Sequence, residues 1–182
     1  MQFQNDKEKI LIIDFGSQVT KLIARRVRDL GVYSEIITPK EFFRFKKFSK
    51  IKGIILSGGP STVTAKKFQS VPKDVLDKNI PILGICYGLQ LIAKQFGGKI
   101  IPSRDREFGK TKIKLTKKSP LLENVLCPNK QVQVWMSHSD KISIIPDSFE
   151  KIASSDNCEF AVIQNQKKKL YGVQFHPEVV HT

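Results

Sequence analysis

Short apolar runs separated by turn residues dominate the first hundred positions of the chain. Residues 10–14 (ILIID), 32–37, 53–56 (GIIL) and 82–85 (ILGI) are such runs. Their length and continuity predict strands that are buried on both faces, as in a parallel sheet. Two stretches that end in glycine instead carry apolar residues at helical spacing, which predicts amphipathic helices. The helical positions are Val19, Leu22, Ile23, Val27 and Leu30 in the first, and Leu89, Ile92, Ala93 and Phe96 in the second.

The pattern changes at about residue 99, where helical spacing gives way to short alternating runs. This order of elements predicts an α/β fold with a mixed, mainly parallel central sheet flanked by helices and a β-rich C-terminal half. A chain of 182 residues is long enough for one such core, so we expect residues 1–182 to form a single domain. The strands expected in the second half are 112–115, 131–136, 151–154, 160–163 and 170–175.

A cysteine stands between the strand at 82–85 and the following helix, within the sequence Gly84-Ile85-Cys86-Tyr87-Gly88. The glycines allow a tight strand-to-helix turn that presents its central side chain clear of the sheet. The N-terminus of the helix favours negative charge, which increases the thiolate fraction of a nearby cysteine. This pattern indicates a nucleophile at Cys86, although by itself the turn fits a cysteine that only packs the core equally well.

A histidine and a carboxylate stand two residues apart near the end of the chain, in residues 173–178 (VQFHPE). In extended backbone these positions project to the same side, and Pro177 disfavours a helix there. Glu178 can therefore orient the ring of His176 and stabilise its protonated form, while the ring exchanges a proton with a thiol. Together with Cys86, the two residues predict a Cys-His-Glu catalytic triad.

Adjacent glycines follow the strand at 53–56, in residues 57–60 (SGGP). Such a loop can turn its backbone amides toward a bound group, so Gly59 is a candidate donor to an oxyanion, and the amide of Tyr87 is the natural second donor. A plain strand-to-loop turn would also contain these residues. A phosphate loop fits poorly, because no Gly-Lys-Ser/Thr sequence follows.

These groups together describe acyl transfer through a thioester. The Cys86 thiolate would attack a carboxamide, backbone amides would hold the oxyanion, and His176 would protonate the departing ammonia. Water would then hydrolyse the acyl-enzyme. A cysteine peptidase could use the same three side chains and is a less favoured alternative.

The motifs resemble those of the class I, triad-type glutamine amidotransferases, over nearly the whole chain. Residues 84–90 (GICYGLQ) match that family's nucleophile motif, residues 57–60 its oxyanion loop and residues 176–178 (HPE) the rest of its triad. The resemblance implies a flavodoxin-like fold of the class I amidotransferase type. Within the family, four segments are similar to the amidotransferase part of bacterial GMP synthases: 13–18 (IDFGSQ), 23–28 (IARRVR), 135–138 (WMSH) and 172–182 (GVQFHPEVVHT).

The resemblance also implies which residues hold the glutamine substrate. One position departs from the GMP synthase pattern, since Ser139 stands where those proteins usually have glycine between the histidine and the aspartate. The implied glutamine-binding residues are Gly58, Gln90, Ser137, His138 and Asp140.

The resemblance implies a partner as well. GMP synthases continue through an ATP-pyrophosphatase domain and a dimerisation domain, and both are absent from this sequence, as is the Ser-Gly-Gly-Val-Asp-Ser motif that binds ATP. We therefore expect no cofactor in this domain, with ATP and Mg²⁺ used only by the synthetase domain. The expected partners are glutamine and an ATP-pyrophosphatase domain or subunit of GMP synthase.

Composition limits the other classes of function. The net charge of +14 could suit a polyanion, but the basic residues are scattered and no nucleic-acid-binding module is present, so nucleic acid is not an expected partner. Cys86, Cys127 and Cys158 have no metal-type spacing, which argues against a zinc site or a disulfide framework. The sequence contains no signal peptide and no apolar run long enough to cross a membrane, so we expect a cytoplasmic protein.

Two alternatives to a GMP synthase glutaminase stay open. An amidotransferase could supply ammonia to a different synthetase, such as one acting on chorismate or forming carbamoyl phosphate, although residues 135–138 argue against this. A catalytically inactive, amidotransferase-like binding protein would also fit the missing synthetase domain and the high positive charge.

Overall fold

One sheet contains all the strands of the part of the chain that the structure describes. This structure is a computed structural model, and it describes residues 7–123, 125 and 130–182, so Cys127 lies outside it. The strand order is β2-β1-β3-β4-β9-β8-β7-β5-β6. The elements are β1 (Lys9–Ile13), α1 (Thr20–Asp29), β2 (Ser34–Ile37), α2 (Pro39–Arg44), β3 (Ile51–Leu56), α3 (Lys73–Leu76), β4 (Ile82–Ile85), α4 (Tyr87–Gln95), β5 (Lys99–Leu115), β6 (Gln131–Ile144), β7 (Glu150–Ser154), β8 (Val162–Asn165) and β9 (Leu170–Val173).

The first five strands in this order, from β2 to β9, run parallel to their neighbours. Four of them come from the first half of the chain, as the apolar runs predict. The fifth, β9, comes from the C-terminal end and pairs with β4 through Gly84↔Gly172 and Ile85↔Val173. The carboxyl ends of β4 and β9 therefore lie side by side, although about 90 positions separate them in the sequence.

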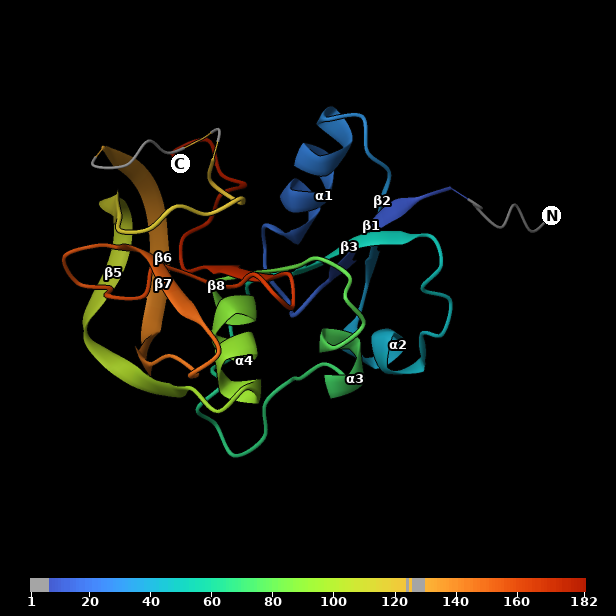
Figure 1. The fold of residues 1–182 in the computed structure, drawn as a ribbon, viewed down its shortest axis with the longest axis horizontal. Coiled ribbons are helices and arrows are strands. Elements are labelled where there is room, and N and C mark those ends of the chain that lie inside the picture. Colours follow the sequence, from blue (N-terminus) through green and yellow to red (C-terminus); the bar gives the residue numbers. More distant parts are fainter. Residues whose placement is uncertain (1–6, 124, 126–129) are drawn as a thin grey trace.

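Helices cover both faces of the parallel strands, with α1 on one face and α2, α3 and α4 on the other (Figure 1). Alternate residues of β1 face opposite sides of the sheet, and both sides are covered, so Leu11, Ile12 and Ile13 are all buried. Leu11 and Ile13 pack in the core that contains Leu89 of α4, whereas Ile12 packs in the core that contains Ile23 of α1. The predicted mixed α/β sheet with flanking helices is confirmed.

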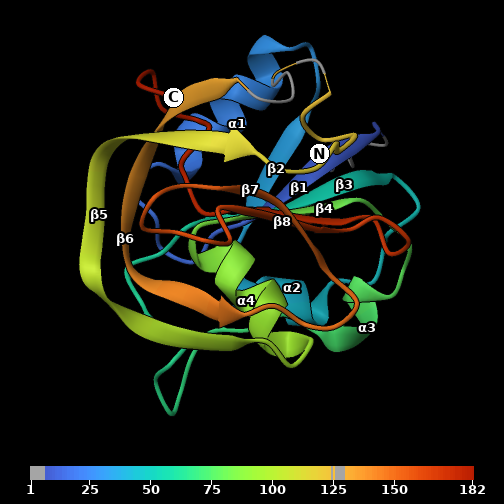
Figure 2. The same cartoon turned by 60° about the vertical axis from the view of Figure 1, so that its left-hand side comes forward.

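The antiparallel half of the sheet is formed by β8, β7, β5 and β6. The strands β5 and β6 are much longer than the runs 112–115 and 131–136 that predicted them, and they pair from Lys99↔Ile144 to Lys114↔Gln131. Figure 2 shows this hairpin curving around one side of the molecule. The register shifts between Pro102 and Glu107, so a regular alternation of apolar and polar residues is lost there.

The pattern of apolar residues does not predict two short helices, α2 and α3. The first begins with a capping box in which the Glu41 backbone N–H donates to Thr38 Oγ1 at 3.2 Å and the Thr38 N–H donates to Glu41 Oε2 at 2.7 Å. The sequence Thr-Pro-Lys-Glu is typical of a helix start and could have revealed it. None of the helices in the described ranges is long and apolar enough to cross a membrane.

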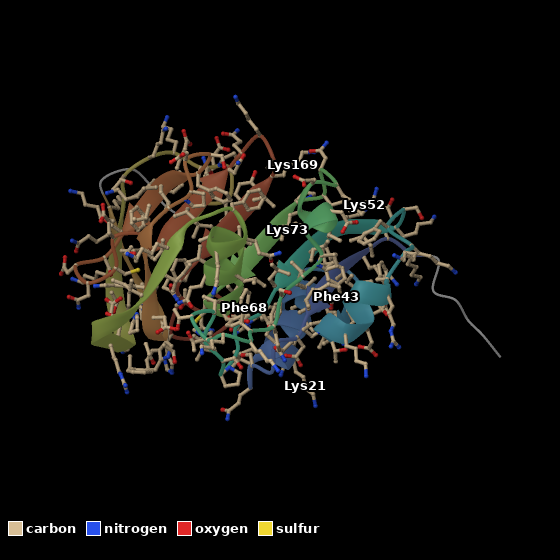
Figure 3. The ribbon with its side chains drawn as sticks, turned by 90° about the horizontal axis from the view of Figure 1, so that it is seen from below. Lys21, Phe43, Lys52, Phe68, Lys73 and Lys169 are labelled. Atoms are coloured by element: carbon tan, nitrogen blue, oxygen red, sulfur yellow. The ribbon has the colours of Figure 1, made fainter. Side chains whose placement is uncertain are left out.

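Positive charge is distributed over several elements. Figure 3 shows Lys21 on α1, Lys52 on β3, Lys73 on α3 and Lys169 in the turn before β9. Some lysines are paired with carboxylates, as in the Lys52–Glu8 ion pair at 2.8 Å.

The turn from β4 into α4 requires glycine at two positions. A Cβ atom at Gly88 would lie 2.3 Å from the backbone oxygen of Leu56, and a Cβ atom at Gly84 would lie 2.5 Å from the backbone of Gly88. No side chain fits at such distances, so α4 approaches β3 and β4 backbone to backbone. This close approach fixes the start of α4 over the carboxyl end of β4.

We predict that Gly88→Ala lowers the free energy of unfolding by about 3 kcal/mol or more, because the added methyl group would force α4 away from β3. Gly97→Ala is the matched control, since Gly97 follows the same helix with φ 93° and has open space around its Cβ position. The control should lose only about 1–2 kcal/mol, the cost of a left-handed backbone. Urea denaturation of both variants checks this, and equal losses would contradict the packing explanation.

Candidate active site

Cys86 stands at the turn between β4 and α4 with an unusual backbone conformation, φ 51° and ψ −103°. A positive φ is uncommon for a residue with a side chain and persists only where the surrounding structure enforces it. Here the Cys86 N–H donates to the Val173 carbonyl at 2.8 Å, which ties the turn to β9. The Cys86 Sγ atom lies 3.6 Å from the Ser137 carbonyl oxygen of β6.

His176 reaches Cys86 from the segment after β9. Its backbone N–H donates to the Trp135 carbonyl at 3.0 Å, and its carbonyl accepts from the Thr182 hydroxyl at 2.7 Å. The ring lies beside Cys86, since a Cβ atom at Gly58 would lie 3.1 Å from His176 Cε1 and 3.8 Å from Cys86 Cβ, and its Nδ1 lies 2.8 Å from Glu178 Oε1. The structure therefore brings together the three residues that the sequence proposed as a triad.

Glu178 is held in place by an arginine of α1. The Arg26 Nε–H donates to the Glu178 backbone carbonyl at 3.1 Å, and the Glu178 side chain is buried. A buried carboxylate that contacts an imidazole restricts the orientation of the ring and favours its charged form.

The surroundings of His176 favour the imidazolium. Burial of the ring opposes protonation, but hydrogen bonds with Cys86 and Glu178, and the charges of these two groups, outweigh it and raise the pKa of His176 to about 10. A protonated ring beside the thiol can stabilise a thiolate and can later donate a proton. The arrangement thus suits a nucleophilic sulfur paired with a general acid.

Cys158 has a different environment. Burial, and then the nearby Glu107 carboxylate, raise the pKa of the Cys158 thiol to about 12. A thiol that keeps its proton at neutral pH is a poor nucleophile. Of the two described cysteines, Cys86 is therefore the candidate nucleophile.

The glycines of the 57–60 loop lie close to Cys86 and His176. A Cβ atom at Gly58 would lie 3.1 Å from His176 Cε1, and one at Gly59 would lie 2.8 Å from the Phe15 carbonyl oxygen. The loop can approach the reacting groups only because it lacks side chains at these positions. Tyr87 is the first residue of α4, so its backbone N–H has no acceptor within the helix.

A pocket of about 430 Å³ opens beside Cys86. It is bounded by the 57–60 loop with the residues after it, by the start of α4 and by β6. Of the residues proposed to hold the oxyanion or glutamine, only Gly58 does not line it. The lining residues are Gly59, Pro60, Ser61, Thr62, Cys86, Tyr87, Gln90, Phe108, Ser137, His138, Ser139 and Asp140.

Two of the side chains proposed to bind glutamine already have partners within the protein. The Gln90 amide donates to the Asp140 carbonyl at 2.8 Å and to the Gln174 side chain at 3.2 Å. His138 is buried, with Nδ1 3.0 Å from the same carbonyl and Nε2 3.0 Å from Glu107 Oε2. Both residues shape the wall of the pocket through Asp140, and direct contact with glutamine stays a prediction.

Two further residues at the site were not predicted from the sequence. Gln174 lies two residues before His176 on an extended segment, and this spacing could have revealed it, because the two side chains share a side. The Gln174 Nε2 atom donates to Cys86 Sγ at 3.5 Å. The second residue is Thr62, whose hydroxyl donates to the Asp140 carboxylate. No local pattern marks Thr62, since the contact joins positions 78 residues apart.

Cys86 and His176 also border a second cavity of about 370 Å³, on the side of the molecule where α1 begins. Gly16, Gln18 and Val179 contribute to its lining. The two cavities share Gly59, Pro60, Cys86 and Ser137 in their lining, so they meet at the sulfur.

Comparison with known proteins agrees with this site. The family model described as glutamine amidotransferase class-I matches residues 11–182. The chain is 46% identical to the glutamine-hydrolysing GMP synthase of Photorhabdus laumondii and 48% identical to that of Brachyspira hyodysenteriae. These matches cover 97% and 98% of this chain but only 34% of either relative, so the chain spans about a third of their length.

Solved structures show the same fold. A Thermoplasma acidophilum protein assigned as one of the subunits of GMP synthase is 33% identical, with a TM-score of 0.81 over 97% of this chain and 87% of its own. A glutamine amidotransferase from Thermotoga maritima is 21% identical with a TM-score of 0.78, over 94% of this chain and 76% of its own, which supports the fold alone. The sequence match over residues 11–182 and these structural matches together show that the chain belongs to the class I glutamine amidotransferase family.

Proposed function

We propose that this chain is the glutaminase component of GMP synthase, which hydrolyses glutamine and supplies ammonia for the conversion of XMP to GMP. The observation that carries the proposal is the contact of Cys86 with His176, itself bonded to Glu178, at the edge of a pocket. The identity of 46% to 49% with GMP synthases across most of this chain supports this acceptor over others.

Catalysis begins with the paired thiolate and imidazolium. The Cys86 sulfur attacks the side-chain carbonyl carbon of glutamine, which forms a carbon–sulfur bond and places negative charge on the carbonyl oxygen. The Gly59 and Tyr87 backbone N–H groups donate to that oxyanion, because both residues border the pocket beside the sulfur.

The carbon–nitrogen bond then breaks. His176 gives its proton to the departing amide nitrogen, which leaves as ammonia, and the glutamyl group stays on Cys86 as a thioester. Glu178 keeps the ring oriented through the contact at Nδ1 during this exchange. The neutral ring next accepts a proton from water, the resulting hydroxide attacks the thioester, and glutamate is released as the thiolate and imidazolium are restored.

The reaction that consumes the ammonia takes place on a partner domain or subunit. The matched GMP synthases are about three times as long as this chain. We propose that an ATP-pyrophosphatase domain or subunit binds ATP and Mg²⁺, adenylylates XMP and receives the ammonia, so that no cofactor is used at Cys86. Purine biosynthesis of this kind places the protein in the cytoplasm.

Replacing the nucleophile tests the proposal. We predict that Cys86→Ala lowers glutamine-dependent GMP formation by about 10⁶-fold in an enzyme reconstituted with a synthetase partner, because no thioester can form. GMP formation from added ammonium is the control and should persist, since it bypasses the glutaminase. Undiminished formation of GMP from glutamine would sink the assignment of Cys86.

Replacing the carboxylate tests its effect on the ring. In the folded wild-type protein the imidazolium of His176 should persist until the pH approaches about 10. We predict that Glu178→Gln moves this titration to lower pH, because one of the two groups that stabilise the charge is lost, and lowers glutaminase kcat on the order of 10²-fold or more. Nitrogen-15 NMR of the ring reports the titration directly.

The contribution of His176 to the stability of the fold decreases as the pH rises. Because folding raises the pKa of the ring above its usual 6.5, the stabilisation is complete below about pH 6.5 and is lost as the pH rises toward about 10. The Glu178→Gln variant should therefore lose less stability than the wild type between those pH values. A titration midpoint that is the same in both proteins would show that Glu178 does not act on the ring.

A further inference from the structure

Behind the pocket wall, three buried side chains that can bind a metal converge from different parts of the chain. Glu107 comes from β5, His138 from β6 and Cys158 from the segment between β7 and β8. One ligand atom of each lies within 4.8 Å of the other two, and all three residues are buried. We refer to these three residues as the 107–138–158 cluster.

The cluster lies outside the catalytic machinery proposed above. None of its members contributes a group to the attack, the oxyanion or the proton transfer. Only His138 borders the pocket, and both of its ring nitrogens are directed to protein atoms.

The surrounding hydrogen bonds orient two of the three side chains. His138 Nδ1 lies 3.0 Å from the Asp140 carbonyl, which can only accept, so Nδ1 carries a proton and Nε2, which lies 3.0 Å from Glu107 Oε2, faces the cluster. The Ser155 hydroxyl donates to Glu107 Oε1 at 3.1 Å, which leaves Oε2 beside the histidine. Ligands of metal ions in proteins are oriented by partners of this kind.

The donor set matches the charge of a divalent cation. When bound, Glu107 would supply a carboxylate, Cys158 a thiolate and His138 a neutral imidazole, and the protons that these groups carry before binding would leave to solvent. The two negative charges would cancel the two positive charges of the ion, so the buried cluster would be neutral.

We infer that the 107–138–158 cluster is a binding site for a zinc-like divalent cation, with Glu107 Oε2, His138 Nε2 and Cys158 Sγ as ligands. Thiolate, imidazole and carboxylate together suit Zn²⁺, with bond lengths of about 2.0–2.3 Å. Such bonds place tetrahedral ligands about 3.3–3.7 Å apart, so small side-chain rotations would close the cluster around the ion. The cation would join β5, β6 and the segment before β8 directly behind Asp140.

Cobalt(II) absorption tests the site, because a thiolate bound to cobalt gives a charge-transfer band. The Cys86→Ser/Cys127→Ser protein has Cys158 as its only thiol, which excludes binding at the catalytic residues as a source of the band. After dialysis against a chelator, titration should give one equivalent of bound cobalt, visible bands of a four-coordinate ion, and displacement by Zn²⁺. No charge-transfer band in this protein would overturn the inference.

Three further variants of this protein locate the ligands. Cys158→Ser should abolish the charge-transfer band, and Glu107→Gln and His138→Gln should each weaken cobalt binding at least tenfold. Circular dichroism verifies that each variant is folded. Unchanged affinity in both Glu107→Gln and His138→Gln would overturn the assignment, because the ion would then be bound by the thiol alone.

Thermal unfolding gives a readout that does not depend on absorption or on glutaminase activity. Excess Zn²⁺ should raise Tm of the Cys86→Ser/Cys127→Ser protein by roughly several degrees, because only the folded chain assembles the site. Adding Glu107→Gln should reduce this rise, because the weakened site stabilises the folded chain less. A rise of equal size with and without Glu107→Gln would contradict the proposed site.

Discussion

The strained backbone of Cys86 is the constraint on which the rest of the site depends. A residue with a side chain holds φ 51° only because its neighbours leave no other conformation. The 2.8 Å hydrogen bond to Val173 fixes one side of the turn, and the contact between Gly88 and the Leu56 backbone fixes the other. The thiol is consequently presented at the start of α4, between the glycine loop and β6.

The position of β9 in the sheet completes the site. Because β9 pairs with β4 in parallel register, the chain that leaves β9 passes directly over the turn containing Cys86. The backbone N–H of His176 donates to the Trp135 carbonyl and its carbonyl accepts from the Thr182 hydroxyl, and these two hydrogen bonds hold the ring at the sulfur. Burial would otherwise disfavour the imidazolium, so the contacts with Glu178 and Cys86 decide its charge.

A connected set of buried polar groups supports the pocket wall. The Asp140 carbonyl accepts from both Gln90 and His138, and His138 continues to Glu107. Polar networks in low dielectric become rigid when every member has a partner. Gln90 and His138, which the resemblance assigned to glutamine binding, therefore border the pocket and also hold its wall in place through Asp140.

The sequence by itself determined the local elements and motifs. The apolar runs, the Gly-x-Cys-x-Gly turn and the i, i+2 spacing of His176 and Glu178 are readable because they depend on neighbouring positions. The tertiary structure alone decided that β9 pairs with β4, that β5 and β6 extend far beyond their apolar runs, and that Glu107 and Cys158 meet at His138. Those outcomes depend on strand register and on contacts between distant segments, which no short window of sequence contains.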